Sequence, residues 1–341
     1  MTRMNKVAHA ARGLGLAAIM MLTASATGAA AQDAKAITMR LSTASFNDAQ
    51  HEWMKRFAVA IEKNTNGRIK PELFPASQLG SIPRQIEGTQ QGSIQAWLGP
   101  PEFLVGVDRR FEVLSAPGLF QNDKEAFKVF DDTAFNKAFL DIATNKGLVG
   151  AALFYTGPAA YNMRVPTHHL ADLKGRKIRV LASQFQTEPL RRLGATGVPM
   201  TLGDVLPALQ QGTIDGTYGA VSVYNALKFY DAAKYMVETR HAYFYSVTML
   251  SKRWYDGLPT DLQDQIMTTS KQVASEVLPW SLQFLEQSRA AWTANGGEMV
   301  TLPEAESKEL KEKLASVGDD IVKDKPDMKP MWDMLVAISK R

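Results

Sequence analysis

Beyond its N-terminal segment, the chain alternates short apolar runs with longer segments whose apolar residues repeat at helical spacing. Residues 37–41 form one such run, and Trp53 and Phe57 then fall on a single helical face. Further runs cover residues 69–74 and 94–98. Short runs predict strands and the longer periodic segments predict helices. Strands that alternate with helices predict an α/β fold with mainly parallel sheets, covered on both faces.

The pattern continues with longer elements in the middle of the chain. A helix is expected over residues 124–145, followed by strands at 148–155 and 177–181. Residues 235–251 alternate aromatic and apolar side chains on one face, which predicts a long strand that crosses back between two lobes.

A long helix is expected near the C-terminal end. Thr260 and Gln263 have the spacing of a capping box, and the helical pattern runs from there to about Asn295. At about 1.5 Å per residue this helix would be roughly 50 Å long. That length suits a helix spanning two small lobes.

A short internal repeat supports two lobes. Residues 90–95 read Gln-Gln-Gly-Ser-Ile-Gln, and residues 210–215 read Gln-Gln-Gly-Thr-Ile-Asp. Each lies between a predicted helix and a predicted strand. Such a short match can arise by chance, but a true duplication would give each lobe an equivalent helix-to-strand unit.

The N-terminus has the pattern of an export signal. Arg3, Lys6 and Arg12 precede an apolar run at residues 14–22, and small residues follow up to Ala31. This order is typical of a secretory signal peptide, and the apolar run is about half as long as a membrane span. We therefore expect residues 1–31 to be a signal peptide and the rest to be exported to the periplasm.

Composition narrows the class of partner. The formal charge of the chain is +4, and residues 1–31 carry three basic and no acidic residues, so the remainder has about +1. This balance argues against nucleic acid as a partner. The chain has no cysteine, which excludes disulfides and thiolate chemistry. Its length exceeds one compact core and favours two lobes.

The sequence shows no pattern typical of an enzyme. His51, His168, His169 and His241 have no metal-ligand spacing, and neither a nucleophile elbow nor a phosphate-binding loop is present. We therefore expect no catalytic residue, no metal site and no cofactor.

One basic residue stands out in a predicted strand. Arg179 and Lys177 alternate with Ile178 and Val180, so both charges share one face. Because both faces of a parallel sheet are usually covered, a charge there needs a partner. A guanidinium pairs well with a carboxylate, which can belong to a ligand between the lobes or to a protein acid.

Aromatic residues near strand ends are candidate walls of a pocket. Trp97, Tyr155, Tyr161 and Tyr218 lie at predicted strand ends or in the turns after them. Ligands of open α/β sheets bind at such ends. Ordinary packing is the alternative for each of them.

Several stretches together resemble the substrate-binding proteins of TRAP (tripartite ATP-independent periplasmic) transporters, in the manner of dicarboxylate-binding proteins. The matching stretches are Lys63–Ile69, Phe74–Gly80, Asp172–Val180, Leu193–Ala195, Val198–Met200, Leu209–Gly212, Asp215–Gly216, Lys228–Tyr230 and Lys234–Tyr235. The resemblance covers essentially the whole chain after the signal.

The resemblance implies a two-lobed periplasmic binding protein fold, type II-like, with crossing hinge strands and a long lobe-spanning helix. One lobe would comprise residues 32–156 and about 245–284, and the other 157–244 and about 285–341. It further implies that Arg179 binds the carboxylate of a small organic acid, which is then delivered to a TRAP permease.

The chain departs from the family pattern around the implied pocket. Many relatives carry a second arginine where the segment 157–162 has an alanine. Residues 217–220, which include Gly219, replace a more polar stretch, and Leu202 stands where relatives can have an aromatic contact. These departures predict a monocarboxylate, or an acid whose distal part is apolar or aromatic. A ligand-presenting sensor component and a periplasmic enzyme on the same fold are the alternative functions.

Overall fold

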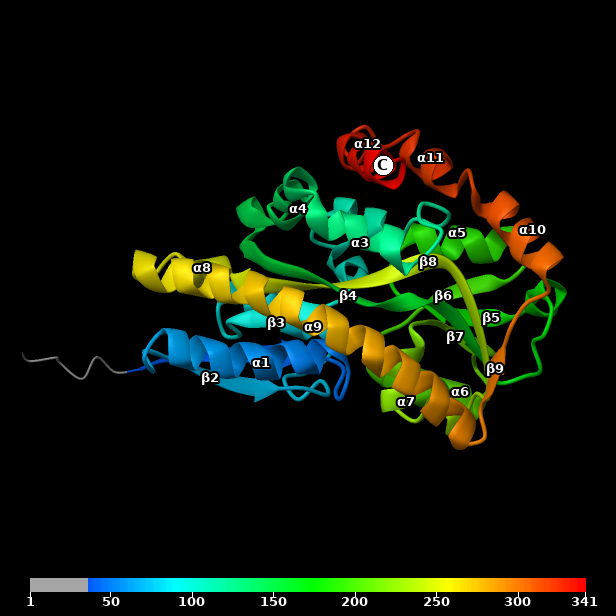
Figure 1. Ribbon diagram of the computed structural model, residues 1–341, viewed down its shortest axis with the longest axis horizontal. Coiled ribbons are helices and arrows are strands. Elements are labelled where there is room, and N and C mark those ends of the chain that lie inside the picture. The colour runs from blue at the N-terminus through cyan, green and yellow to red at the C-terminus, as the bar shows by residue number, and fades with distance from the viewer. Residues whose placement is uncertain (1–35) are drawn as a thin grey trace, which may run out of the picture. The chain divides into compact units, whose positions relative to one another are not determined.

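The computed structural model describes residues 36–341, which form one compact unit (Figure 1). The predicted signal peptide, residues 1–31, lies outside the described residues. The first half of the described chain contains β1 (Ile37–Thr43), α1 (Ala49–Asn64), β2 (Ile69–Phe74), α2 (Ile82–Gln91), β3 (Ala96–Gly99), η1 (Pro101–Leu104), η2 (Arg109–Ser115), α3 (Asp123–Asp131), α4 (Thr133–Leu140), η3 (Thr144–Lys146) and β4 (Leu148–Met163).

The second half begins with the short helical turn η4 (Leu170–Leu173) and ends in helices. Its further elements are β5 (Lys177–Val180), α5 (Gln184–Arg192), β6 (Thr196–Pro199), α6 (Leu202–Gln211), β7 (Gly216–Gly219), α7 (Val221–Ala226), η5 (Phe229–Asp231), β8 (Tyr235–Ser251), α8 (Lys252–Tyr255), α9 (Thr260–Ala294), β9 (Glu298–Val300), α10 (Glu304–Leu314), α11 (Val317–Val322) and α12 (Lys329–Ser339).

All strands join one nine-stranded sheet with two similar wings. The order is β2-β1-β3-β8-β4-β7-β5-β6, with β9 pairing β8. In the first wing β1 is parallel to β2 and β3, and in the second wing β5 is parallel to β6 and β7. The central pairs β3–β8, β8–β4 and β4–β7 are antiparallel. The predicted α/β fold is thus confirmed, with parallel pairs in both wings and one more between β8 and β9.

The two wings repeat the same β-α-β-α-β unit, as the sequence echo suggests. Helices α2 and α6 each have ten residues, and corresponding positions are 120 residues apart. Each ends at a glycine, Gly92 or Gly212, with φ of 90° or 71°. Glycine is favoured there because a side chain is strained in this left-handed conformation.

Two long strands connect the wings. β4 and β8 pair from Leu148 with Ser251 to Met163 with Tyr235, so each begins beside one wing and ends beside the other. The expected strand at 148–155 therefore continues through Pro158. The register shifts twice near that proline, between Tyr155 and Gly157 and again between Pro158 and Ala160. These shifts accommodate a residue that cannot donate a ladder hydrogen bond.

The long helix is confirmed, but its predicted capping box is wrong. Helix α9 has 35 residues, and its buried residues include Val277, packed with the core of the first wing, and Trp292, packed with that of the second. Figure 1 shows it running from α1 to α7. Gln263 donates its side-chain hydrogen bonds to the carbonyls of Tyr255 and Leu258 instead of closing a box. Among residues 36–341, no helix has the length and apolarity needed to cross a membrane.

The helix expected over residues 124–145 is wrong as a single element. It divides into α3 and α4 at Asp132, whose side chain accepts a hydrogen bond of 2.8 Å from the backbone N–H of Phe135. Aspartate is favoured at a helix N-cap, where its side chain accepts a backbone hydrogen bond, and it is less favourable inside a helix.

The division into lobes stays a prediction, and we propose one change to it. Helix α12 shares a hydrophobic cluster with Phe135 and Phe139 of α4, through Trp332 and Leu335 among others. We therefore propose that α12 belongs with the first lobe, although the rest of residues 285–328 stays with the second.

Buried carboxyl groups tie the turns after β3 to the start of α5. Glu112 accepts hydrogen bonds from Ser183 Oγ at 3.1 Å and from the backbone N–H of Gln184 at 2.7 Å. Glu102 accepts from Ser115 Oγ and, at 3.4 Å, from Gln186 Nε2. Burial raises the pKa of Glu102 to about 7, because desolvation disfavours its charged form.

Replacing Glu102 with glutamine should reduce the loss of folding stability that the wild-type protein shows between pH 5 and pH 8. The folded state holds the Glu102 proton more tightly than the unfolded chain, so wild-type stability falls as pH rises from about 4.5 through about 7. Glu102→Gln removes that loss, and its stability gain over wild type should grow to the order of 2 kcal/mol at pH 8. Urea denaturation at pH 5 and pH 8 measures the difference. Glu87→Gln, on the exposed face of α2, is the control, and an equal gain at both pH values would contradict the prediction.

Candidate functional site

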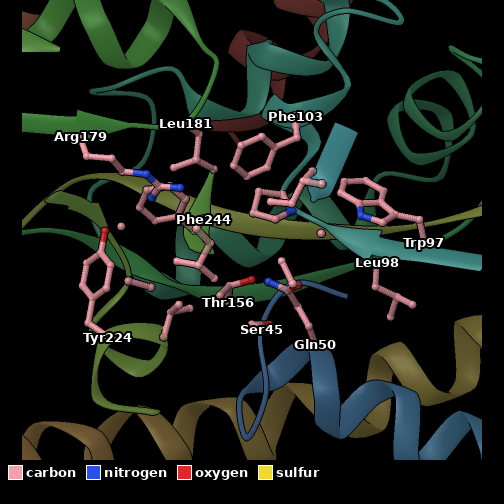
Figure 2. Close-up of a pocket in the computed structure, with 18 residues that line it drawn as sticks. Ser45, Gln50, Trp97, Leu98, Phe103, Thr156, Arg179, Leu181, Tyr224 and Phe244 are labelled. Atoms are coloured by element: carbon pink, nitrogen blue, oxygen red, sulfur yellow. The ribbon is translucent and has the colours of Figure 1, made fainter. Parts of the chain in front are cut away.

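A cavity lies between the two wings, where the carboxyl ends of their strands meet (Figure 2). It contains about 550 Å³ of empty space, which includes the open solvent at its mouth. Residues at or just after the ends of β1, β3, β5 and β7 contribute to its wall, as expected for an open α/β sheet. The lining residues are Ala44, Ser45, Gln50, Ile82, Trp97, Leu98, Gly99, Pro100, Phe103, Thr156, Arg179, Leu181, Leu202, Gly219, Ala220, Val223, Tyr224 and Phe244.

Among the lining residues in the described part of the chain, Arg179 is the one with a charged side chain. Its side chain is almost fully buried, with 3% of the residue exposed, and its Nε donates a hydrogen bond of 2.9 Å to the carbonyl of Met200. Within residues 36–341 its guanidinium forms no salt bridge, so the alternative of a protein acid as partner is not realised there. Burial lowers the pKa of Arg179, and nearby Tyr224 and Glu102 act in the opposite direction.

The second wing holds Tyr224 beside the guanidinium. The Tyr224 hydroxyl lies 2.9 Å from Thr217 Oγ1 and points toward Arg179 (Figure 2). A Cβ at Gly219 would lie 2.3 Å from that hydroxyl oxygen, so only glycine leaves room for it. Gly219 therefore shapes the site through its missing side chain.

In the first wing, Gly99 stands at the equivalent position of the repeat and also makes room for an aromatic side chain. A Cβ at Gly99 would lie 2.3 Å from Cζ2 of Trp97, so this glycine lets the indole fold over the end of β3. Trp97 is 1% exposed. Figure 2 shows Trp97 and Arg179 at opposite ends of the cavity.

Four predicted site residues line the cavity and three do not. Arg179, Trp97, Gly219 and Leu202 are in its wall, and their contact with a ligand stays a prediction.

The three predicted tyrosines do not line this cavity. Tyr155 packs against Phe127 on the other face of β4, and its hydroxyl donates to Asp123. Because side chains alternate along a strand, its neighbour Thr156 faces the cavity instead.

Tyr161 and Tyr218 are cross-strand partners in the core of the second wing. Their ring centroids are 5.2 Å apart, and both rings stack on His241. The three rings are buried together outside the cavity wall, and Tyr218 packs against Phe244, which does line the cavity.

Several lining residues escape prediction from sequence. Phe103, Thr156, Gln50 and Phe244 come from four separate elements, and none belongs to a local motif. Tyr224 could be suspected from the sequence only weakly, because it follows the turn after a predicted strand. Among residues 36–341 no cluster of three or more histidine and acidic side chains could hold a metal ion.

Known proteins with the same fold bind small acids. The E. coli K12 protein called 2,3-diketo-L-gulonate-binding periplasmic protein YiaO is 29% identical over 231 residues, or 67% of this chain and 70% of its own. The sugar acid binding protein DctPAm of Advenella mimigardefordensis, solved with galactonate, has a TM-score of 0.84 at 24% identity, covering 90% of this chain and 99% of its own.

A second solved structure is somewhat more similar in sequence. It is a TRAP periplasmic solute binding protein from Xanthobacter autotrophicus Py2 with bound β-D-galacturonate. Its TM-score is 0.81 at 27% identity, and the match covers 88% of this chain and 99% of that one.

The family model named DctP, for bacterial extracellular solute-binding protein, family 7, matches residues 41–325. This match spans both wings, the crossing strands and the long helix. The chain therefore belongs to family 7 of the bacterial extracellular solute-binding proteins.

Proposed function

We propose that this protein captures a small organic acid in the periplasm, between its two wings, and delivers it to a TRAP-type membrane permease. The observation that carries the proposal is the buried guanidinium of Arg179, which lines the cavity and forms no salt bridge with a carboxylate of residues 36–341. Burying an unpaired charge costs free energy, and a ligand carboxylate offsets that cost through charge-assisted hydrogen bonds.

The relatives support an acid as the ligand. The names of the relatives described above refer to 2,3-diketo-L-gulonate, galactonate and galacturonate, each of which carries a carboxylate. Their names also place YiaO and the Xanthobacter protein in the periplasm and the latter in a TRAP system.

A single carboxylate fits the charge of the cavity. Arg179 is the only charged side chain among the described lining residues, and Tyr224 beside it supplies one further polar group. A second carboxylate would be buried without a cation, which is costly. We therefore favour a monocarboxylate.

Carboxylic acids that bind should stabilise the protein against heat, whereas their uncharged amides should not. A ligand at one hundred times its Kd stabilises the folded state by about 2.7 kcal/mol. Thermal unfolding would be measured with a panel of monocarboxylates and the matching primary amides. Equal stabilisation by an acid and its amide would contradict the carboxylate anchor.

Arg179→Ala should lose most of the affinity for any acid found in that panel. Removing one partner of a buried charge pair costs about 2 to 5 kcal/mol of binding free energy. Titration calorimetry measures the loss. Lys177→Ala is the matched control, because Lys177 lies on the same strand with its side chain exposed. Retained affinity in Arg179→Ala would reject the proposed role of Arg179.

A further inference from the structure

We propose that the end of the cavity opposite Arg179 is a second subsite, in which Trp97 and Gln50 donate hydrogen bonds to an uncharged oxygen at the far end of the bound acid. This inference rests on the proposed function, since it assumes that the carboxylate occupies the Arg179 end. It changes the expected ligand from an acid with a wholly apolar remainder to one with an acceptor oxygen at its tip.

Trp97 supplies the first donor. Its Nε1–H is buried and has no hydrogen-bond partner among residues 36–341. Leaving a buried donor unpaired costs about 1 to 3 kcal/mol, so a ligand that accepts from it gains affinity. In Figure 2 the indole nitrogen lies on the side of the ring that faces the cavity.

An unpaired indole alone does not mark a site in this protein. Trp53, in the core beside α9, also has a buried Nε1–H without a partner in the described part of the chain, and it does not line the cavity. Trp97 differs because its ring is part of the cavity wall and a second donor lies in the same wall.

Gln50 supplies that second donor. Its residue is 4% exposed, and its Oε1 accepts a hydrogen bond of 2.7 Å from Thr43 Oγ1. This bond orients the amide, whose Nε2 donates to no other side chain or carbonyl in residues 36–341. The backbone N–H of Gln50 donates to Asp48 Oδ1 at 3.1 Å, which fixes the residue in the first turn of α1.

The wall between the two ends is mostly apolar. Phe103, Leu181, Leu202, Val223 and Phe244 line it together with Leu98 and Ile82. Trp97 Nε1 and Gln50 Nε2 are neutral donors, so they suit a carbonyl or hydroxyl oxygen better than a second carboxylate, which would need a cation when buried. The chemical class is therefore an oxo or hydroxy monocarboxylate with an apolar or planar body.

Pairs of acids that differ in one oxygen test the subsite. Suitable probes are 4-oxopentanoate with 4-methylpentanoate, 5-oxohexanoate with 5-methylhexanoate, and 6-oxoheptanoate with 6-methylheptanoate, because in each pair a carbonyl oxygen replaces a methyl group. For the chain length that fits, the wild-type protein should bind the oxo acid about 3 to 10 times more tightly by calorimetry. Equal or weaker binding of all three oxo acids would overturn the inference without needing a variant.

Two variants assign the preference to the named donors. Trp97→Phe and Gln50→Met each remove a donor, the second with little change in volume and the first with the loss of three ring atoms. Each should reduce the ratio of the two dissociation constants at least threefold. Trp53→Phe is the matched control, since it removes an equally unpaired indole N–H outside the cavity, and it should leave the ratio within a factor of two. An unchanged ratio in both cavity variants would overturn the role of Trp97 and Gln50.

The outcome also separates this inference from the proposed function. Acids that bind in an Arg179-dependent manner but show no preference within the pairs would refute only the distal subsite. If no acid binds, or if Arg179→Ala binds as the wild type does, the proposed function itself fails and the subsite with it.

Discussion

A buried guanidinium that forms no salt bridge within residues 36–341 is the constraint on which the site depends. Arg179 is held by one hydrogen bond to a backbone carbonyl and by the neighbouring Tyr224 hydroxyl, and desolvation lowers its pKa. Both partners lie in the second wing, as does Arg179. The protein therefore keeps a charge in an apolar wall at a cost in free energy, and a carboxylate from outside the chain is the group that can offset it.

The repeat explains why the cavity has two differently equipped ends. The wings have the same β-α-β-α-β order, and each ends at a glycine that makes room for an aromatic ring, Gly99 for Trp97 and Gly219 for Tyr224. In the second wing the aromatic supports a cation, whereas in the first wing it presents a neutral donor. One architecture, used twice, thus gives a ligand a direction in the cavity.

Much of the fold follows from local patterns in the sequence. The strands of the first wing, β5, the long strand β8 and helix α9 follow clear patterns in the sequence, and Arg179 stands out because it interrupts an apolar strand. The helix break at Asp132 was missed because a capping side chain competes with a periodic pattern that continues on both sides.

The residues that line the cavity are harder to predict from sequence than the helices and strands, for a different reason. Which face of β4 a tyrosine occupies depends on register shifts around Pro158, and these arise from pairing with β8, about 90 residues away in sequence for Thr156 and Ser246. Gln50 of α1 and Phe244 of β8 line the same cavity although they are far apart in sequence. Such neighbours are set by tertiary packing and leave no local signal.

The crossing of β4 and β8 also has a mechanical consequence. The two strands pass between the wings as a hydrogen-bonded pair, so a twist of one wing against the other would break ladder bonds, whereas a bend across the pair would keep most of them. The shifts beside Gly157 and Pro158 are where the ladder is already interrupted. We therefore expect the pair to bend most readily at these two shifts, which lie next to Thr156 in the cavity wall.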